Sequence, residues 1–450
     1  MDLREPGASL EGCRVTVMGL GRFGGGAGVV RWLVRRGADV LLTDMAPQDR
    51  LEAPLRELAD VIDSGAVQLR LGGHNISDFT GADAVVVNPA VAQPWDNRFL
   101  RAAAAGGVPL VTEIEMVVAR LPARSRVIGV TGTAGKSTTS ALIEHGLRHL
   151  GARARLGGNI GGSLLGAIDE IGPDEWIVLE LSSAMLHWLG AGPAGWSPHI
   201  AVATNLAPNH LDWHGTSVHY EQSKRAIVRG QAEGDGAVLG PGTDHWETNF
   251  GVHRRVAPPE AAVAGLAIPG GHNAFNGAVA AAAIEFALPG AGLDRICEAL
   301  RSFGGLAPRL EFVGEGRGVR FYNDSKSTTP EATVRAVEAL HESMPQAVGR
   351  IHLIAGGYDK QVDLGLIGAM AGQLAGLYTI GATGAALAQG PGERFSCGTL
   401  EGAMERIGGR AQRGDVVLLS PGCASWDQFD NFERRGEMFC TLARAWMERV

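Results

Sequence analysis

Residues 130–139 read VTGTAGKSTT, and they lie between the apolar run 126–130 and a segment with a helical pattern. A strand that turns through two glycines into a helix suits a polyphosphate. Successive backbone N–H groups curl around phosphate oxygens there, and the helix N-terminus adds partial positive charge. Lys136 can then reach the terminal phosphates, and the Ser137 hydroxyl can ligate Mg²⁺. We predict a nucleoside triphosphate site formed by Gly132, Thr133, Ala134, Gly135, Lys136, Ser137 and Thr138.

Short β-branched runs alternate with longer helical patterns through most of the chain. Several runs are apolar throughout, as strands covered by helices on both faces should be. The pattern predicts an α/β protein with parallel, doubly wound sheets. The expected strands are residues 14–19, 40–44, 84–88, 127–131, 176–181, 199–205, 319–323, 351–356, 378–381 and 416–420.

Two transitions divide the chain. A helical stretch ends in Leu-Pro-Ala-Arg-Ser within residues 112–125, and Gly-Gly-Leu-Ala-Pro-Arg lies within residues 303–309. The segment 230–259, rich in Gly, Asp and His, fits short strands or loops and is left unassigned. We therefore expect three α/β domains, with the phosphate loop in the middle one, spanning residues 1–114, 115–305 and 306–450.

Composition excludes several classes of protein. The net charge of −8 argues against DNA or RNA as the main partner. The first ten residues lack the apolar core of a secretory signal, and no apolar stretch is long enough to span a bilayer. The five cysteines are scattered and form no CxxC pair, which is typical of reduced thiols. We expect a cytoplasmic protein that binds small molecules, with no nucleic-acid or membrane partner, and a monomer.

The first domain carries a second glycine-rich turn. Residues 19–24 read GLGRFG after a clear strand, and Asp44 ends the next strand about where a dinucleotide fold places its ribose acid. Taken alone, this motif indicates a nicotinamide-dependent dehydrogenase. The same geometry binds any pyrophosphate at a helix N-terminus, so a nucleotide diphosphate attached to a larger group fits equally well.

Four groups of polar residues in the middle domain are catalytic candidates. Glu180 ends an apolar strand near the phosphate loop, where an acid can hold Mg²⁺, although a surface glutamate is the ordinary alternative. His210 follows another strand, and Lys224 lies on an expected helix, where a structural histidine and a solvated lysine are the defaults. Asn273 and Asn276 begin an alanine-rich helix, which makes capping the ordinary reading.

Together the motifs resemble the Mur ligase family of ATP-dependent enzymes that form amide bonds, and most of all its glutamate-adding members. The resemblance covers nearly the whole chain in collinear order. Its motifs are GLGRFG at 19–24, TGTAGKST at 131–138, GGNIG at 157–161, ELSS at 180–183, NLAPNHLD at 205–212, GHNAFN at 271–276, APR at 307–309, NDSKST at 323–328 and SPGCASWDQFDNFERRG at 420–436. The last block is long and particular.

The resemblance implies a fold and a reaction. Rossmann-like first and third domains would flank a central P-loop ATPase-type domain. The enzyme would join glutamate, in its D form, to UDP-N-acetylmuramoyl-L-alanine during peptidoglycan precursor synthesis. The substrate carboxylate would attack the γ-phosphate of ATP, and the glutamate amine would attack the resulting acyl phosphate. Because ATP and glutamate contacts come from different domains, the domains should close around the substrates.

The resemblance also assigns residues. Ser137 and Glu180 would hold one Mg²⁺, and His210 and Lys224 a second, with Lys224 carbamylated because an ammonium group has no lone pair to offer a metal. Lys136, Glu180, His210 and Lys224 form the implied catalytic set. Further ATP contacts would come from Asn273, Asn276, Arg309 and Asp324. The UDP substrate would contact Leu20, Gly21, Arg22, Asp44, Asn88, Asn159 and His210. Glutamate would contact Lys326, Thr328, Lys360, Ser425 and Phe432.

The chain departs from the usual family pattern at five places. These are Ala90, Ala134, Asn209, Trp426 and Pro330. Trp426 follows the serine of the implied glutamate pocket, so an L-glutamate-adding ligase, or another amide ligase of the superfamily such as a folylpolyglutamate synthetase, stays an alternative. A dehydrogenase and a non-catalytic nucleotide-binding regulator are the alternatives from other classes.

Overall fold

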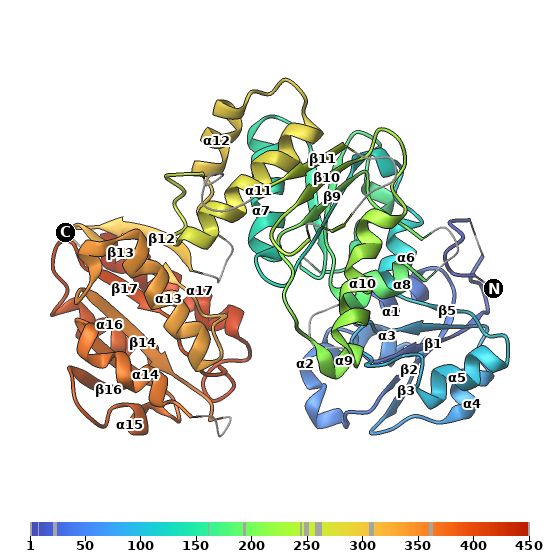
Figure 1. Cartoon of the computed structure of the whole chain (residues 1–450). Coiled ribbons are helices and arrows are strands. Elements are labelled where there is room, and N and C mark those ends of the chain that lie inside the picture. The colour runs from blue at the N-terminus through green and yellow to red at the C-terminus, as the bar shows by residue number, and fades with distance from the viewer. Residues whose placement is uncertain are drawn as a thin grey trace. The chain divides into compact units, whose positions relative to one another are not determined.

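The computed structural model describes residues 2–7, 9–20, 25–160, 162–191, 195–243, 245–246, 252–256, 263–305, 310–359 and 363–448. The chain forms two compact units (Figure 1). The first comprises Met1–Ala257 and Val279–Ile296, and the second comprises Pro258–Ala278 and Cys297–Val450. Helix α11 (Gly271–Ala287) therefore contributes to both units.

The first unit contains two sheets, and its N-terminal sheet is parallel throughout. Its strands, in spatial order, are β3 (Val67–Leu71), β2 (Asp39–Asp44), β1 (Arg14–Met18), β4 (Ala84–Val87) and β5 (Leu110–Val111). The helices of this part are α1 (Gly25–Arg35), α2 (Glu52–Arg56), α3 (Ala59–Asp63), α4 (Ile76–Thr80), α5 (Arg98–Ala105) and α6 (Glu113–Val118). The order reverses between β1 and β4, which is where open α/β sheets bind ligands.

The second sheet of this unit is also parallel. Its strands, in spatial order, are β11 (Val252–Arg255), β10 (Gly236–Leu239), β9 (Ile200–Ala203), β6 (Val127–Thr131), β8 (Trp176–Glu180) and β7 (Ala154–Gly158). Its helices are α7 (Lys136–His149), α8 (Ser183–Leu189), α9 (Leu211–His214), α10 (Ser217–Arg229), α11 and α12 (Leu293–Arg301). Every residue of β6, β8 and β9 is buried, as expected of strands covered on both faces.

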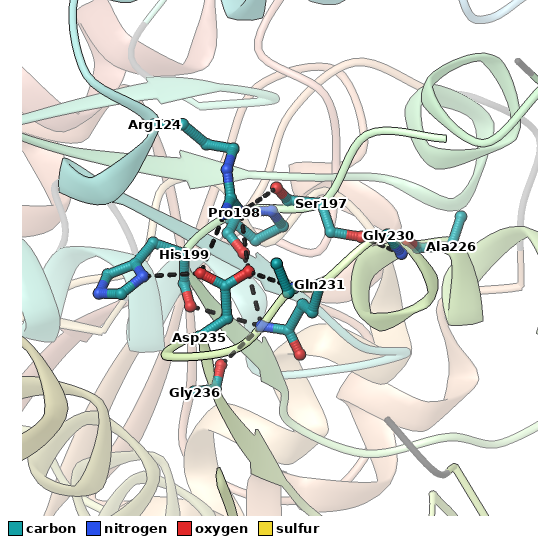
Figure 2. Close-up of polar contacts among 10 residues, drawn as sticks. Arg124, Ser197, Pro198, His199, Ala226, Gly230, Gln231, Asp235 and Gly236 are labelled. Atoms are coloured by element: carbon teal, nitrogen blue, oxygen red, sulfur yellow. Dashed lines mark hydrogen bonds and ion pairs between the residues drawn. The ribbon is translucent and has the colours of Figure 1, made fainter. Parts of the chain in front are cut away.

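An ion-pair network secures the amino-terminal edge of this second sheet (Figure 2). Asp235, 3% exposed, accepts two hydrogen bonds from Arg124, at 2.9 and 3.1 Å, and a third contact comes from His199 Nδ1 at 2.8 Å. Burial raises the pKa of Asp235, but the hydrogen bonds from Arg124, Ala232 and His199 outweigh it and hold that pKa below its usual value. Arg124 lies on the segment that enters β6, so the network fixes where the chain enters this sheet.

The second unit has one mixed sheet. Its strands, in spatial order, are β12 (Glu311–Gly316), β13 (Val319–Asn323), β17 (Val416–Leu419), β14 (Ile351–Gly356), β15 (Gly376–Ile380) and β16 (Arg394–Gly398). Only the pairing of β12 with β13 is antiparallel among these described strands. The helices are α13 (Pro330–Ser343), α14 (Gly365–Ala369), α15 (Gly384–Leu387), α16 (Leu400–Gly408) and α17 (Phe432–Glu448).

All ten strands expected from the sequence are present. Seven further strands were not expected, namely β3, β5, β7, β10, β11, β12 and β16. The unassigned segment 230–259 contains two of them, β10 and β11. Antiparallel β12 corrects the expectation of parallel pairing throughout, because a tight turn at Arg317–Gly318 returns the chain directly to β13. Each predicted domain contains one sheet, whereas its boundaries at 114 and 305 stay a prediction.

Candidate active site

The phosphate loop connects β6 to α7 at the carboxyl edge of the central sheet. Gly135 precedes α7 with φ of +80°, a left-handed conformation that favours glycine. A Cβ on Gly132 would lie 1.9 Å from Thr204 Oγ1, so only glycine fits there. The Lys136 ammonium group donates to the carbonyls of Gly132 and Thr133, at 3.0 and 3.1 Å. Lys136, Ser137 and Thr138 form the first turn of α7, as the triphosphate hypothesis requires.

The segment after β9 holds this loop in shape. The Asn205 side chain accepts from the Ala134 amide and donates to the Ala134 carbonyl, both at 3.0 Å. Thr133 donates its amide to the Asn205 carbonyl, and its hydroxyl contacts Tyr220. The N–H and the carbonyl of Ala134 are thereby both fixed, which preorganises the loop for a phosphate.

Lys224 lies beneath the loop. Its side chain, on α10, is 1% exposed, and its Nζ donates to the Gly132 carbonyl at 2.8 Å and to Thr131 Oγ1 at 3.2 Å. Burial, and then the positive charge of Lys136, hold the pKa of Lys224 well below its usual range, although Glu180 opposes this. Among the described residues no carboxylate pairs with this amine. Burial at this site therefore disfavours the ammonium form of Lys224 relative to a lysine in water.

Glu180 is the buried acid of the site. It ends β8, is 2% exposed, and accepts from Asn159 Nδ2 through Oε1 at 2.8 Å. Its other oxygen, Oε2, is buried and has no hydrogen-bond partner among the described residues. A buried carboxylate oxygen without a partner is costly, and a cation would satisfy it.

The available ligands suit an Mg²⁺ ion that is held partly by substrate and water, rather than an ion enclosed by protein ligands alone. The described residues contain no group of three His, Cys, Asp or Glu side chains that could hold a metal ion. Mg²⁺ is usually bound through one or two carboxylates together with substrate phosphates and water. Glu180 and the hydroxyl of Ser137, at the start of α7, fit that pattern.

His210 lies on the same side of the site. It directly precedes α9, and its backbone is left-handed, with φ of +51°. Partial burial, and then the positive charges of Lys136 and Lys224, lower the pKa of His210, against the opposing charge of Asp212. A neutral imidazole has a lone pair that a metal or a substrate proton can use. The structure thus brings the four predicted catalytic residues to one edge of the central sheet.

The candidate UDP residues of the first sheet also converge. Leu20 donates its amide to Asp44 Oδ2 at 2.9 Å, and Asn88 Nδ2 donates to the Gly19 carbonyl at 3.3 Å. The other oxygen of Asp44 accepts from the Ala46 amide, so this carboxylate fixes the turn itself. Asn159 lies with Glu180 rather than with this group. Gly21 and Arg22 lie outside the described residues.

The candidate glutamate residues gather in the second unit, after the adjacent parallel strands β13 and β17. Lys326 and Thr328 follow β13, and Lys326 Nζ lies 5.5 Å from the ring centre of Phe432, the first residue of α17. Ser425, 2% exposed, follows β17. The Gly422 amide donates to the Ser327 carbonyl and so joins the two loops. Lys360 lies outside the described residues.

The remaining ATP candidates also belong to the second unit. Asp324 accepts from the Leu310 amide at 3.1 Å and from Ser420 Oγ at 2.7 Å, next to the predicted glutamate residues. Asn273 and Asn276 are buried in the first two turns of α11, where Asn276 Nδ2 donates to Asn273 Oδ1. Asn273 itself donates to the Pro269 carbonyl at 2.6 Å. Arg309 lies outside the described residues.

Comparison with known proteins decides the family. Three family models match: "Mur ligase MurD-like, N-terminal domain" over residues 13–112, "Mur ligase middle domain" over 130–267, and "Mur ligase, glutamate ligase domain" over 308–423. A UDP-N-acetylmuramoylalanine–D-glutamate ligase from Acidobacterium capsulatum is 33% identical, over 97% of this chain and 97% of that protein. Proteins of the same name from Pelotomaculum thermopropionicum and a Roseiflexus species are 35% and 36% identical, over 95–96% of this chain and 96–98% of theirs.

The chain belongs to the Mur ligase family. It is therefore an ATP-dependent ligase that forms amide bonds, and Mg²⁺ is the usual metal of such ligases. The three-domain α/β fold expected from the sequence is confirmed. Among solved structures, UDP-N-acetylmuramate–alanine ligase MurC from Thermotoga maritima has this fold, with a TM-score of 0.57 at 18% identity over 96% of this chain and 99% of that one. MurF from the same organism, solved with ADP, has a TM-score of 0.50 at 18% identity over 86% of this chain and 92% of its own.

Sequence reasoning missed three residues that shape this Mur ligase's site. Asn205 braces the phosphate loop, Trp213 ties α9 to the first sheet's loops, and Arg435 lies at the centre of the predicted glutamate region. Asn205 could have been found, because it follows a strand expected beside the phosphate-loop strand. The other two carry no signal of their own, since their roles depend on which segments pack together.

Among the residues that the structure describes, each helix is too short or too polar to cross a membrane.

Proposed function

We infer that this Mur ligase joins D-glutamate to UDP-N-acetylmuramoyl-L-alanine at the expense of ATP, in peptidoglycan precursor synthesis. The observation that carries this inference is the similarity, at 33–36% identity over nearly the whole chain, to three ligases of that name. The proposed site residues follow strands of all three sheets, which supports the inference.

The reaction divides into two steps. A carboxylate oxygen of the muramoyl-alanine attacks the terminal phosphorus of ATP, and the bond from that phosphorus to ADP breaks. The glutamate amine then attacks the acyl carbon, loses a proton and expels phosphate. Lys136 would neutralise charge on the transferred group, and the braced amides of the loop would orient it. When bound, Mg²⁺ supplies further charge neutralisation for phosphoryl transfer.

We propose two Mg²⁺ positions. Ser137 and Glu180 would hold one ion, which is supported by the buried oxygen of Glu180 that has no partner among the described residues. His210 and Lys224 would hold the other, with Lys224 as a carbamate. The unprotonated amine adds to carbon dioxide, forms an N–C bond and releases one proton, which turns a cation into an oxygen ligand. Deep burial without a carboxylate partner supports this role for Lys224.

We also propose the substrate contacts. The UDP substrate would contact Leu20, Gly21, Arg22, Asp44, Asn88, Asn159 and His210. ATP would contact residues 132–138 together with Asn273, Asn276, Arg309 and Asp324. Glutamate would contact Lys326, Thr328, Lys360, Ser425 and Phe432. We further propose that the enzyme acts as a monomer in the cytoplasm.

One assay tests the function and its nearest alternative. Product mass and phosphate release are measured with UDP-N-acetylmuramoyl-L-alanine, ATP and Mg²⁺, together with D-glutamate or L-glutamate. We expect a product with D-glutamate and little with L-glutamate. The alternative rests on Trp426, which is exposed beside Ser425 and lies 5.5 Å from the Tyr358 ring, so it can reshape the pocket. Turnover of L-glutamate alone would establish the alternative, and no glutamate-dependent release of phosphate would overturn both.

A further inference from the structure

Helix α9 sets the position of His210 but is not stable without contacts to the rest of the protein. It has only four residues, Leu211–His214, and so short a helix has no stability of its own in water. His210 is a non-glycine residue in the left-handed region, with φ of +51°, which is an unfavourable conformation that surrounding contacts must maintain. The position of the imidazole therefore depends on what anchors α9.

Trp213 supplies one anchor. It is 7% exposed, and its indole N–H donates to the Pro89 carbonyl at 3.1 Å. The loop that contains Pro89 also bonds to α9 through Gln93. The Gln93 amide donates to the Trp213 carbonyl at 3.3 Å, and Gln93 Nε2 donates to the Asp212 carbonyl at 3.4 Å. Gln93 also has a left-handed backbone, with φ of +44°, so strained residues lie on both facing segments.

The anchoring loop starts at the predicted UDP site. We call residues 88–96 the anchoring loop. It follows β4 directly, and its first residue, Asn88, donates to the Gly19 carbonyl beside Leu20. The loop therefore joins the turn that would bind the UDP group to the short helix that carries His210.

His214 supplies a second anchor on the opposite side. It is 2% exposed, its Nε2 contacts Ser183 Oγ on α8 at 2.9 Å, and its Nδ1 contacts His219 Nδ1 on α10 at 2.9 Å. Helix α10 also carries Lys224, the proposed partner of His210. His214 fixes α9 to the central sheet's own helices, whereas Trp213 and the two Gln93 hydrogen bonds fix it to the anchoring loop of the first sheet.

We propose that Trp213 is a positioning residue, which anchors α9 on the anchoring loop and thereby sets His210 for Mg²⁺ and substrate. This inference rests on the proposed role of His210. It adds a residue from outside the phosphate loop, and it links the first sheet's nucleotide edge to the catalytic edge of the second.

The first test needs no ligand. Trp213→Phe keeps an aromatic ring but removes the indole N–H donor together with part of the side chain's volume, and the control substitution shares that loss of volume. In hydrogen–deuterium exchange of the full chain alone, amides in residues 208–216 should exchange about five- to tenfold faster, as the loss of one hydrogen bond implies. The control is Trp32→Phe, since Trp32 is buried in α1 and its indole nitrogen has no hydrogen-bond partner among the described residues. Unchanged exchange at 208–216 in Trp213→Phe would overturn the anchor.

The second test measures the consequence for His210. Trp213→Phe should raise the half-saturating Mg²⁺ concentration of D-glutamate-dependent phosphate release about fivefold and leave the KM for ATP within about twofold. In a His210→Ala background the same substitution should have little further effect, because the group that it positions is gone. An equal loss in both backgrounds would overturn the role.

The failure of the proposed function and the failure of the Trp213 anchor can be told apart. Absence of activity in the wild type overturns the proposed function, whereas the exchange measurement still decides whether Trp213 anchors α9. If Trp213→Phe does not fold, Gln93→Ala removes the side-chain bond to Asp212. A twofold to threefold faster exchange at 208–216 then supports the restraint of α9 by the anchoring loop, and unchanged exchange overturns that restraint.

Discussion

The Lys224 amine lies where a protonated lysine is costly. It is enclosed by the phosphate loop, by the Tyr220 ring at 5.0 Å and by α10 itself, and its partners are a carbonyl and a hydroxyl. Neither partner carries a negative charge that would offset burial. A carbamate would replace that cation with a carboxylate that can face Mg²⁺.

Lys224→Ala should lose most activity, about a hundredfold or more, because the proposed carbamate ligand of Mg²⁺ disappears. Added formate or acetate should restore part of that activity by supplying a carboxylate in the vacated space. Gln222→Ala, at an exposed site on the same helix, is the control and should retain activity. Turnover of UDP-N-acetylmuramoyl-L-alanine with glutamate measures both effects. Wild-type turnover in Lys224→Ala would remove the lysine from the metal site.

Glu113 makes stability depend on pH. Its Oε1 lies 2.7 Å from Ser163 Oγ, and burial raises its pKa to about 7 despite that hydrogen bond. Because the folded-state pKa exceeds the unfolded value of about 4.5, the group's contribution to stability is fully present below pH 4.5 and is lost as pH rises through 7.

Glu113→Gln imitates the protonated acid and should remove this dependence. The free energy of unfolding of the wild type relative to the variant should fall by about 2 kcal/mol between pH 4.5 and pH 8, after allowance for solvent screening. Denaturant unfolding of both proteins across that pH range measures the difference. A constant difference would mean that the pKa of Glu113 is the same in the folded and unfolded protein.

At the scale of elements, the sequence predicts the interior strands of each sheet but not the edge strands. Six of the seven unexpected strands, β3, β5, β7, β11, β12 and β16, are the edge strands of the three sheets. Interior strands are covered on both faces and read as continuous apolar runs, whereas edge strands such as Val67–Leu71 carry polar and charged residues. The periodicity that identifies a strand is weakest there.

The same reasoning applies to the proposed catalytic residues. Glu180 and His210 could be predicted because residues that follow parallel strands meet at one edge of a sheet. The roles of Trp213 and Arg435 could not, because Trp213 bonds the Pro89 carbonyl, far away in the sequence, and Arg435 bonds two separate loops at once, which only the packing brings together. The motif resemblance supplied the proposed ligand residues, and only the packing shows which residues hold them in place.

Asp235 should stabilise the central sheet rather than support catalysis. Its network (Figure 2) lies where strands β6, β9 and β10 begin, whereas the phosphate loop follows the end of β6. Asp235→Asn should lower the free energy of unfolding by about 2 kcal/mol, since it removes the charge that pairs with Arg124. Asp169→Asn is the control: Asp169 pairs with Arg36 at an exposed site, where the expected loss is below about 1 kcal/mol. Denaturant unfolding compares the two, and equal losses would contradict the argument.

Arg435 joins three loops of the second unit. It is 1% exposed, and its guanidinium donates to Ser325 on the β13 loop and to the carbonyls of Cys423 and Ala424 on the β17 loop. A Cβ on Gly357, after β14, would lie 3.2 Å from its Nη1, so the third loop also packs on it. These are the loops that flank the proposed glutamate residues.

Arg435→Lys should raise the KM for glutamate about tenfold, because an ammonium group cannot form the same planar set of hydrogen bonds. The KM for the UDP substrate, whose proposed contacts lie in the first unit, should change little. Arg434→Lys, at an exposed ion pair with Glu437 on the same helix, is the control. Equal increases in both KM values would indicate a general loss of structure instead of a role in the glutamate pocket.

At the scale of the whole molecule, the two units have separate cores, and the UDP substrate and glutamate have their proposed contacts in different units, whereas the proposed ATP contacts come from both. All proposed contacts of the UDP substrate belong to the first unit, and those of glutamate belong to the second. The tryptophans distinguish the units: Trp32, Trp95, Trp176, Trp188, Trp196, Trp213 and Trp246 belong to the first, and Trp426 and Trp446 to the second. Tryptophan fluorescence therefore reports mainly on the first unit, while calorimetry reports on both.

UDP-N-acetylmuramoyl-L-alanine alone should therefore stabilise one unit selectively. At about a hundred times its Kd, it should add about 2.7 kcal/mol to the first unit and raise the fluorescence-detected Tm by about 5 °C. Calorimetry should then contain one shifted and one unshifted transition, because a ligand stabilises only the cooperative unit that binds it. A single transition that shifts as a whole would mean that α11, which contributes to both units, couples their unfolding completely.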